Sequence, residues 1–106
     1  MDVNELLDIL YTVPYGKLIN GTVDYRVRTF TDVTSNFARV DIDFLRGNTC
    51  IGFIRVYGNN TIDPAFPEEY ERNTTYKCYS ECFKAMEQVI AYLEILGFKT
   101  IWLLWI

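Results

Sequence analysis

The sequence predicts one α+β domain over residues 1–106, in which two helices cover one face of a mostly antiparallel sheet, in the order α-β-β-β-β-α-β. Residues 22–58 contain runs in which apolar and polar residues alternate, the period of half-buried strands. Residues 3–10 and 76–96 instead carry apolar residues every three or four positions, the period of amphipathic helices. A chain of 106 residues can bury one core without metals or disulfides.

The first predicted element is a short helix that begins after Asp2. Asp2 and Glu5 have the spacing of a capping box, in which each side chain accepts from the other residue's backbone N–H. Pro14 ends the helical pattern. The apolar stripe consists of Val3, Leu6, Leu7 and Leu10.

Four strands are predicted next, as an antiparallel meander. Asn20-Gly21 separates extended runs at 17–19 and 22–30, and this dipeptide favours a hairpin because both residues tolerate positive φ. Strands at 37–45 and 50–58 follow the turn sequences "TDVTSN" and "RGNT".

A long loop is predicted from 58 to 75, with one helical turn after Pro67 as an option, because the segment is rich in proline, asparagine and acids. A long helix then runs from Tyr76 to Leu96. Gly97 occupies the position where a left-handed residue ends a helix, and Phe98 can contact Leu93 in a Schellman-type cap.

The chain ends on "GFKTIWLLWI", in which the residues from 101 to 106 are all apolar. A strand covered on both faces has this composition. The run is far shorter than the ~20 residues of a helical membrane span. The long helix is expected to cover one face of this strand. The first helix or a second copy of the chain is expected to cover the other, so a homodimer is one candidate assembly.

Composition and charge narrow the classes of function. Ten Lys and Arg against fourteen Asp and Glu, with no His, give a net charge of −4, which argues against nucleic acid as a general partner. The start "MDVNELLDILYTV" lacks the features of a signal peptide, and three cysteines do not make a disulfide framework. We therefore expect a cytoplasmic protein with reduced thiols and no membrane partner.

No residue set in the sequence predicts catalysis or a cofactor. Cys78 and Cys82 lie four apart on the long helix, but a zinc site needs two further ligands and only Cys50 remains besides. A cysteine or serine nucleophile would lack its usual histidine base. We therefore expect no metal, no cofactor and no enzyme activity.

Two charged regions remain as candidates for binding. Asp41 and Asp43 share one strand face and could hold a cation, or they pair across strands with arginines. The arginines expected on this solvent-facing side are Arg26, Arg28 and Arg39. Together with Lys17 and Arg55 they also suggest a sheet that binds RNA. The acidic residues between them argue against RNA binding.

The second region is the acidic loop "DPAFPEEYERN", in which aromatic side chains stand among like charges. Such a loop can present aromatic anchors to a partner within a steering field, or it is a solvated loop whose aromatics fold back on the sheet. The predicted partner-binding residues are Asp63, Phe66, Glu68, Glu69, Tyr70, Glu71 and Tyr76.

A strand hairpin, "GNTCIGFIRVYGNNTID", then a loop, then "CFKAMEQVIAYLEILGFKTIWLLWI" resembles the middle of the GNAT-type N-acetyltransferases. In that family a helix ending in "LGF" precedes a buried strand. The resemblance covers about half the chain and implies a site for a CoA-type cofactor at Arg72 to Tyr76. This stretch lacks the glycines that bind the pyrophosphate in the family, and the chain stops where the family continues.

The sequence thus favours a small, acidic, non-enzymatic protein-binding module that inhibits or neutralises a larger basic partner. Phage anti-defence proteins, such as anti-CRISPR proteins, and toxin-immunity proteins share this size and charge. The alternative is a degenerate acetyltransferase-like domain that binds a CoA-type cofactor.

Overall fold

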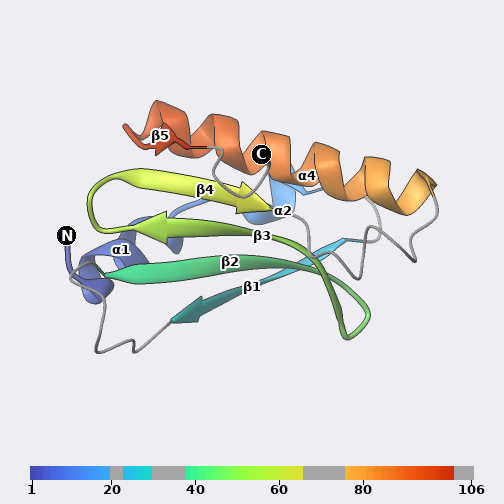
Figure 1. The fold of residues 1–106 in the computed structure, drawn as a ribbon, viewed down its shortest axis with the longest axis horizontal. Coiled ribbons are helices and arrows are strands. Elements are labelled where there is room, and N and C mark those ends of the chain that lie inside the picture. Colours follow the sequence, from blue (N-terminus) through green and yellow to red (C-terminus); the bar gives the residue numbers. More distant parts are fainter. Residues whose placement is uncertain (20–22, 30–37, 66–75, 102–106) are drawn as a thin grey trace.

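A computed structural model describes residues 1–19, 23–29, 38–65 and 76–101, with the backbone alone for 76–80, and confirms the predicted α+β class (Figure 1). One five-stranded sheet has the order β1-β2-β3-β4-β5, antiparallel except that β4 and β5 are parallel. The elements are α1 (Val3–Leu10), α2 (Tyr15–Leu18), β1 (Asp24–Thr29), β2 (Arg39–Arg46), β3 (Thr49–Tyr57), β4 (Thr61–Ala65), α4 (Tyr76–Ile95) and β5 (Lys99–Thr100).

The capping box predicted at the start of α1 is confirmed. The Asp2 carboxylate accepts from the Glu5 N–H at 2.9 Å, and the Glu5 carboxylate accepts from the Asp2 N–H at 3.4 Å. A helix of eight residues is only marginally stable alone, so packing must hold it in place. Leu6 and Leu10 supply this packing, because both are fully buried against the sheet.

The predicted strand at 17–19 is wrong, because residues 15–18 form the helical turn α2. The Leu18 and Ile19 N–H groups donate to the Pro14 and Tyr15 carbonyls at 3.2 and 2.8 Å. A three-residue extended run has little propensity of its own, and the turn buries Tyr15 in the core. The hairpin with 17–19 is therefore wrong as well, whereas the pairing of β1 with β2 that the predicted meander implies is confirmed. The Asn20-Gly21 turn lies outside the described residues.

The predicted loop at 58–75 begins instead with the strand β4, which forms a hairpin with β3. Asn60 makes the turn with a φ of 66°. Pro64 disfavours a strand because it lacks an N–H. In β4, however, the Ile62 carbonyl accepts from the Ile101 N–H, which follows β5 on the side away from β3. Alternate residues of a strand direct their backbone groups to the same side, so those of residues 62 and 64 both point away from β3. The missing N–H of Pro64 therefore removes no hydrogen bond to β3.

The long helix and its cap are confirmed. Gly97 has a φ of 104°, its N–H donates to Glu94, and the Phe98 N–H donates to Leu93, each at 3.0 Å. This pair of bonds defines the Schellman motif. Leu96, the last residue of the predicted helix, lies just beyond the end of α4 at Ile95 and is exposed.

The core lies on one face of the sheet, where α1 and α4 both pack, as predicted. Helix α4 supplies Cys82, Ala85, Met86, Val89, Ile90 and Leu93, and the sheet supplies Val40, Ile42, Phe44, Ile54, Val56 and Ile62. Register explains the grouping, since Val40 is opposite Val56 and Val56 is opposite Ile62. Side chains of alternate residues point to the same face, so the intervening positions lie on the other face.

The predicted C-terminal strand is described only at its start, where β5 pairs parallel to β4. Residues 102–106 lie outside the described residues, so their two-sided burial and the homodimer seam stay predictions. Within the ranges that the structure describes, no helix has the length and apolarity needed to span a bilayer.

Candidate functional site

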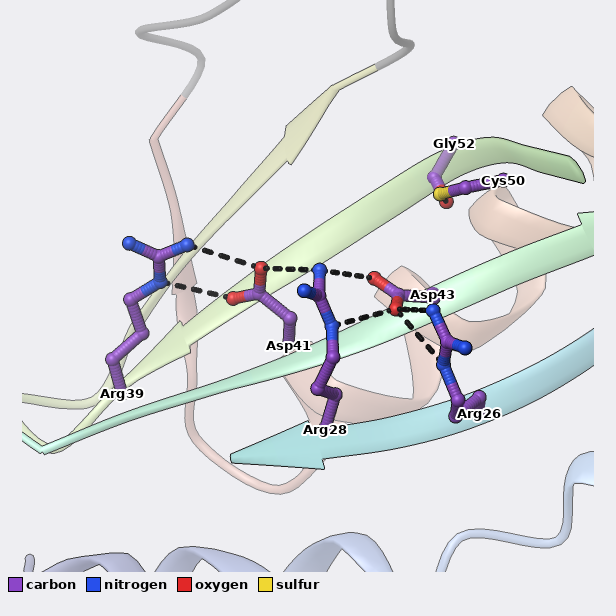
Figure 2. Close-up of polar contacts among 7 residues, drawn as sticks. All are labelled: Arg26, Arg28, Arg39, Asp41, Asp43, Cys50 and Gly52. Atoms are coloured by element: carbon purple, nitrogen blue, oxygen red, sulfur yellow. Dashed lines mark hydrogen bonds and ion pairs between the residues drawn. The ribbon is translucent and has the colours of Figure 1, made fainter. Parts of the chain in front are cut away.

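The face of the sheet opposite the helices carries a row of alternating charges (Figure 2). We call the five residues Arg26, Arg28, Arg39, Asp41 and Asp43 the arginine–aspartate row. Arg26 is opposite Asp43 and Arg28 is opposite Asp41 in the pairing of β1 with β2. The alternation of these strands therefore places all five side chains on the same face.

Asp43 is the centre of the row. Its Oδ2 accepts from Arg26 Nη2 and Arg28 Nε, each at 2.9 Å, and its Oδ1 accepts from Arg28 Nη2 at 3.3 Å. The carboxylate is fully buried, whereas the side chains of Arg26 and Arg28 are 55% and 46% exposed. One buried anion thus holds two half-exposed guanidinium groups in place.

Asp41 continues the row toward Arg39. The Arg39 guanidinium donates to both Asp41 oxygens at 3.1 Å, the bidentate geometry that gives arginine–carboxylate pairs their orientation. Arg28 Nη2 lies 3.9 Å from Asp41 Oδ2 and so links the two carboxylates. Figure 2 shows the resulting chain of contacts from Arg39 through Asp41, Arg28 and Asp43 to Arg26.

The predicted cross-strand pairing of these charges is confirmed, but the carboxylates do not face solvent as expected. Asp41 and Asp43 are both buried, and the guanidinium groups form the outer layer. The longer arginine side chains cover the shorter carboxylates. What the face presents outward is therefore the N–H groups of three arginines whose positions are fixed by charge-assisted hydrogen bonds.

The same alternation continues across the sheet. Arg55 on β3 is opposite both Asp41 and Asp63, and its guanidinium lies 5.0 Å from the centre of the Phe53 ring. This is the geometry of a cation–π contact. The fifth predicted cation, Lys17, belongs to α2 and not to the sheet. Asp63, a predicted partner-binding residue, belongs to β4 and is 2% exposed, so its placement in the long loop at 58–75 is wrong.

The two described cysteines are protonated thiols at neutral pH. Burial, with the Asp43 carboxylate nearby, raises the pKa of Cys50 above its usual range, and burial raises the pKa of Cys82 to about 12. Cys50 Sγ donates to the Gly52 carbonyl at 3.4 Å. The thiolate is the nucleophile and the metal ligand, so this environment suits neither role. Among the described residues, no group of three His, Cys, Asp or Glu side chains could hold a metal ion.

These thiols provide a test of the raised pKa values. In the native protein at about pH 8, we expect Cys50 to react with iodoacetamide at least about tenfold more slowly than free cysteine, and Cys82 more slowly still. Peptide mass spectrometry after timed labelling measures both rates, and the same labelling in urea gives the unfolded reference. Equal rates in the native and unfolded chain would contradict the assignment.

Most of the sequence-predicted partner-binding residues are not described. Phe66, Glu68, Glu69, Tyr70 and Glu71 lie outside the described residues. Tyr76 begins α4, and only its backbone is described. The role of this acidic loop in binding therefore stays a prediction, and the described part of the chain offers the arginine–aspartate row as its candidate surface.

A hollow of about 400 Å³ at the β1 end of this surface was not predicted. Tyr11, Tyr15, Tyr25 and Arg26 are among the residues that line it. The rings of Tyr15 and Tyr25 stack with centroids 4.1 Å apart. The alternation of β1 places Tyr25 on the helix side, but nothing in the sequence places residues 11–15 beside it.

No family model, curated protein or solved structure matches this chain. The order that the acetyltransferase resemblance implied, a hairpin, a helix and a strand, is present as β3, β4, α4 and β5. The side chains of the stretch expected to bind the cofactor, residues 72–76, lie outside the described residues.

Proposed function

We propose that this chain is a small, acidic, non-enzymatic protein-binding module that inhibits or neutralises a larger, basic partner in the cytoplasm. Phage anti-defence proteins and toxin-immunity proteins are the classes it would join. One observation carries the proposal, the arginine–aspartate row on the sheet face that neither α1 nor α4 covers. The acetyltransferase-like alternative has no comparable support among the described side chains.

The row suits binding because its arginines are already ordered. A free arginine side chain loses about 0.5–1.5 kcal/mol of conformational freedom when a complex immobilises it. Arg26 and Arg28 are held by Asp43 before any partner arrives, so this cost is reduced. Arginine is also among the residues that contribute most to binding at protein interfaces.

Charge acts on the proposed encounter at two ranges. The net charge of −4 attracts a basic partner over distances comparable with the screening length. At contact, the row presents the N–H groups of three arginines in fixed positions, so a surface with acceptors at matching positions satisfies it. The field would govern the rate of association, and the row would select the partner.

The test compares two variants that each remove one exposed cation. Arg26→Ser removes a guanidinium from the row, and Asp43 keeps Arg28 as its partner, so the fold should be retained. Lys84→Ser removes an exposed charge from α4 on the other side of the sheet. We expect wild type and Lys84→Ser to capture the same protein from a lysate of the native host. Arg26→Ser should bind that protein at least about tenfold more weakly when both are purified.

Equal affinity of all three proteins for the captured partner would show that the row is not the binding surface. An acidic partner would contradict the steering part of the proposal. Measurement of the association rate at two salt concentrations checks that part, because steering by net charge weakens as salt rises.

A further inference from the structure

Strand β1 is one edge of the sheet (Figure 1). Within the described ranges it pairs with β2 on one side only. An edge strand presents backbone N–H and C=O groups that can pair with a strand of another chain. The hydrogen bonds of the sheet identify which residues of β1 carry these groups.

Alternate residues of an antiparallel strand direct their backbone groups to opposite neighbours. The Ala38 carbonyl accepts from Gly58, so even-numbered residues of β2 face β3 and the odd-numbered Asp41 and Asp43 face β1. Asp41 and Asp43 are opposite Arg28 and Arg26. The backbone of these two arginines therefore bonds β2. The intervening residues, Tyr25, Val27 and Thr29, direct theirs to the open edge.

Asp24 supplies independent support for an open edge. Its carboxylate accepts from the Tyr25 N–H at 2.8 Å, in the place that a neighbouring strand's carbonyl would take. Tyr25 is 41% exposed, although it lies among the apolar side chains of the sheet. The edge therefore carries a donor capped by a side chain and an aromatic ring that stacks on Tyr15 and is still partly exposed.

We propose that β1 docks against β1 of a second copy of this chain, antiparallel, with Tyr25 opposite Tyr25 at the two-fold axis. In this register Asp24 is opposite Arg26 of the second copy, and the symmetry makes the pair twice. Arg26 uses Nε and Nη2 for Asp43, so Nη1 is left for this contact. Opposite charges directly across a strand pair stabilise it.

Charge selects this register over its neighbours. Backbone pairing requires the open-edge residues to face one another, so the register can change only in steps of two. One step places Arg26 of one copy opposite Arg26 of the other, and the next step places Arg26 opposite Arg28. Both registers bring like charges together, and this destabilises a strand pair. Of these three registers, only the one with Tyr25 opposite Tyr25 places no two described like charges opposite each other.

The dimer would extend the arginine–aspartate row. Asp24 releases the Tyr25 N–H, which then bonds the second copy, and its carboxylate turns to the second copy's Arg26. The contacts from Asp43 to Arg26 would continue to Asp24 of the other chain, so the two rows join. This inference goes beyond the proposed function and does not rest on it, since the purified chain alone tests it.

Sedimentation velocity over a concentration series tests the assembly with a matched pair of variants. Asp24→Lys places a lysine opposite Arg26 at both ends of the seam. Asp8→Lys makes the same charge change at an exposed position of α1. We expect wild type and Asp8→Lys to form the same reversible dimer, and Asp24→Lys to have a dissociation constant about tenfold higher or more.

Cross-linking tests the register. Tyr25→Cys would place two thiols on residues whose Cα atoms are about 5.5 Å apart, within disulfide range. Thr29→Cys, also at an exposed position of the same strand, would place them about 26 Å apart at a rise near 3.3 Å per residue. After mild oxidation, with oxidised wild type as background, we expect a disulfide-linked dimer from Tyr25→Cys alone.

A wild-type chain that stays monomeric at every concentration overturns the proposal. A dimer that Asp24→Lys leaves unchanged also overturns it, because the copies then meet at another surface, such as the predicted C-terminal seam. If loss of the Tyr15 stack unfolds Tyr25→Cys, the Asp24 and Asp8 pair still decides, since both change exposed residues. Arg26 belongs to both surfaces, but Asp24→Lys leaves all five residues of the arginine–aspartate row in place, so the dimer can fail without the partner proposal.

Discussion

Replacement of Asp43 by asparagine is expected to lower the free energy of unfolding by about 2–3 kcal/mol. Asp43 is fully buried and accepts hydrogen bonds from two guanidinium groups. Asparagine keeps the shape but removes the charge, and its amide group would point N–H toward one guanidinium. Arg26 and Arg28 are about half exposed and regain water, so the cost stays below the ~3–5 kcal/mol of a fully buried broken pair.

Urea unfolding at neutral pH measures the change, with Asp8→Asn as the control. Asp8 is exposed on α1, and its replacement should change stability by no more than about 0.5 kcal/mol. A difference of less than about 0.5 kcal/mol between Asp43→Asn and wild type would mean that the row contributes little to the fold. Asp43→Asn should also weaken binding of the captured partner, because Arg26 and Arg28 lose their fixed orientation.

The predictable parts of the fold are the elements in which a periodic pattern of apolar residues extends over several turns or positions, or is supported by a motif that ends the element. Helix α4 has several apolar positions at helical spacing, and Gly97 and Phe98 end it by a known motif. The alternation of β1 and β2 identified the face of Arg26 and Asp43 correctly. In each case a periodic pattern and its end signal agreed, so local preference and tertiary packing favoured the same structure.

The elements that were predicted wrongly are short, and tertiary contacts determine their secondary structure. Residues 17–19 read as a strand, but burial of Tyr15 against the core fixes a helical turn. Strand β4 contains Asp63 and Pro64, two residues that are rare within strands, and its pairing on both sides outweighs their low propensity. Neither contact can be read from neighbours in the sequence.

The residues of the candidate site could be predicted from the sequence, but the burial of its carboxylates could not. Period-two alternation places arginines and aspartates on one face, whichever atoms reach solvent. Whether a carboxylate is exposed depends on the length of the side chains beside it, and here arginines from two strands cover Asp41 and Asp43. The open edge of β1 was hidden for a related reason, since the predicted hairpin with 17–19 would have covered it.

Replacement of Phe44 by alanine is expected to have the largest effect on stability, a loss of about 3–5 kcal/mol. Phe44 follows Asp43 on β2 but points to the opposite face, where it is fully buried among the residues of the core. The loss includes the transfer of the ring to water and the cavity that remains. A domain of this size has a total stability of about 5–15 kcal/mol, so Phe44→Ala is expected to be partly unfolded in dilute urea.

Phe44→Leu is the matched variant, because leucine fills most of the space and should cost only about 1–2 kcal/mol. Its fold should persist at room temperature, and the arginine–aspartate row on the other face should be unchanged. We therefore expect Phe44→Leu to bind the captured partner as wild type does, whereas Asp43→Asn binds more weakly even if it is equally stable. If the two variants lost affinity in proportion to their loss of stability, binding would follow the folded fraction and not the orientation of the arginines.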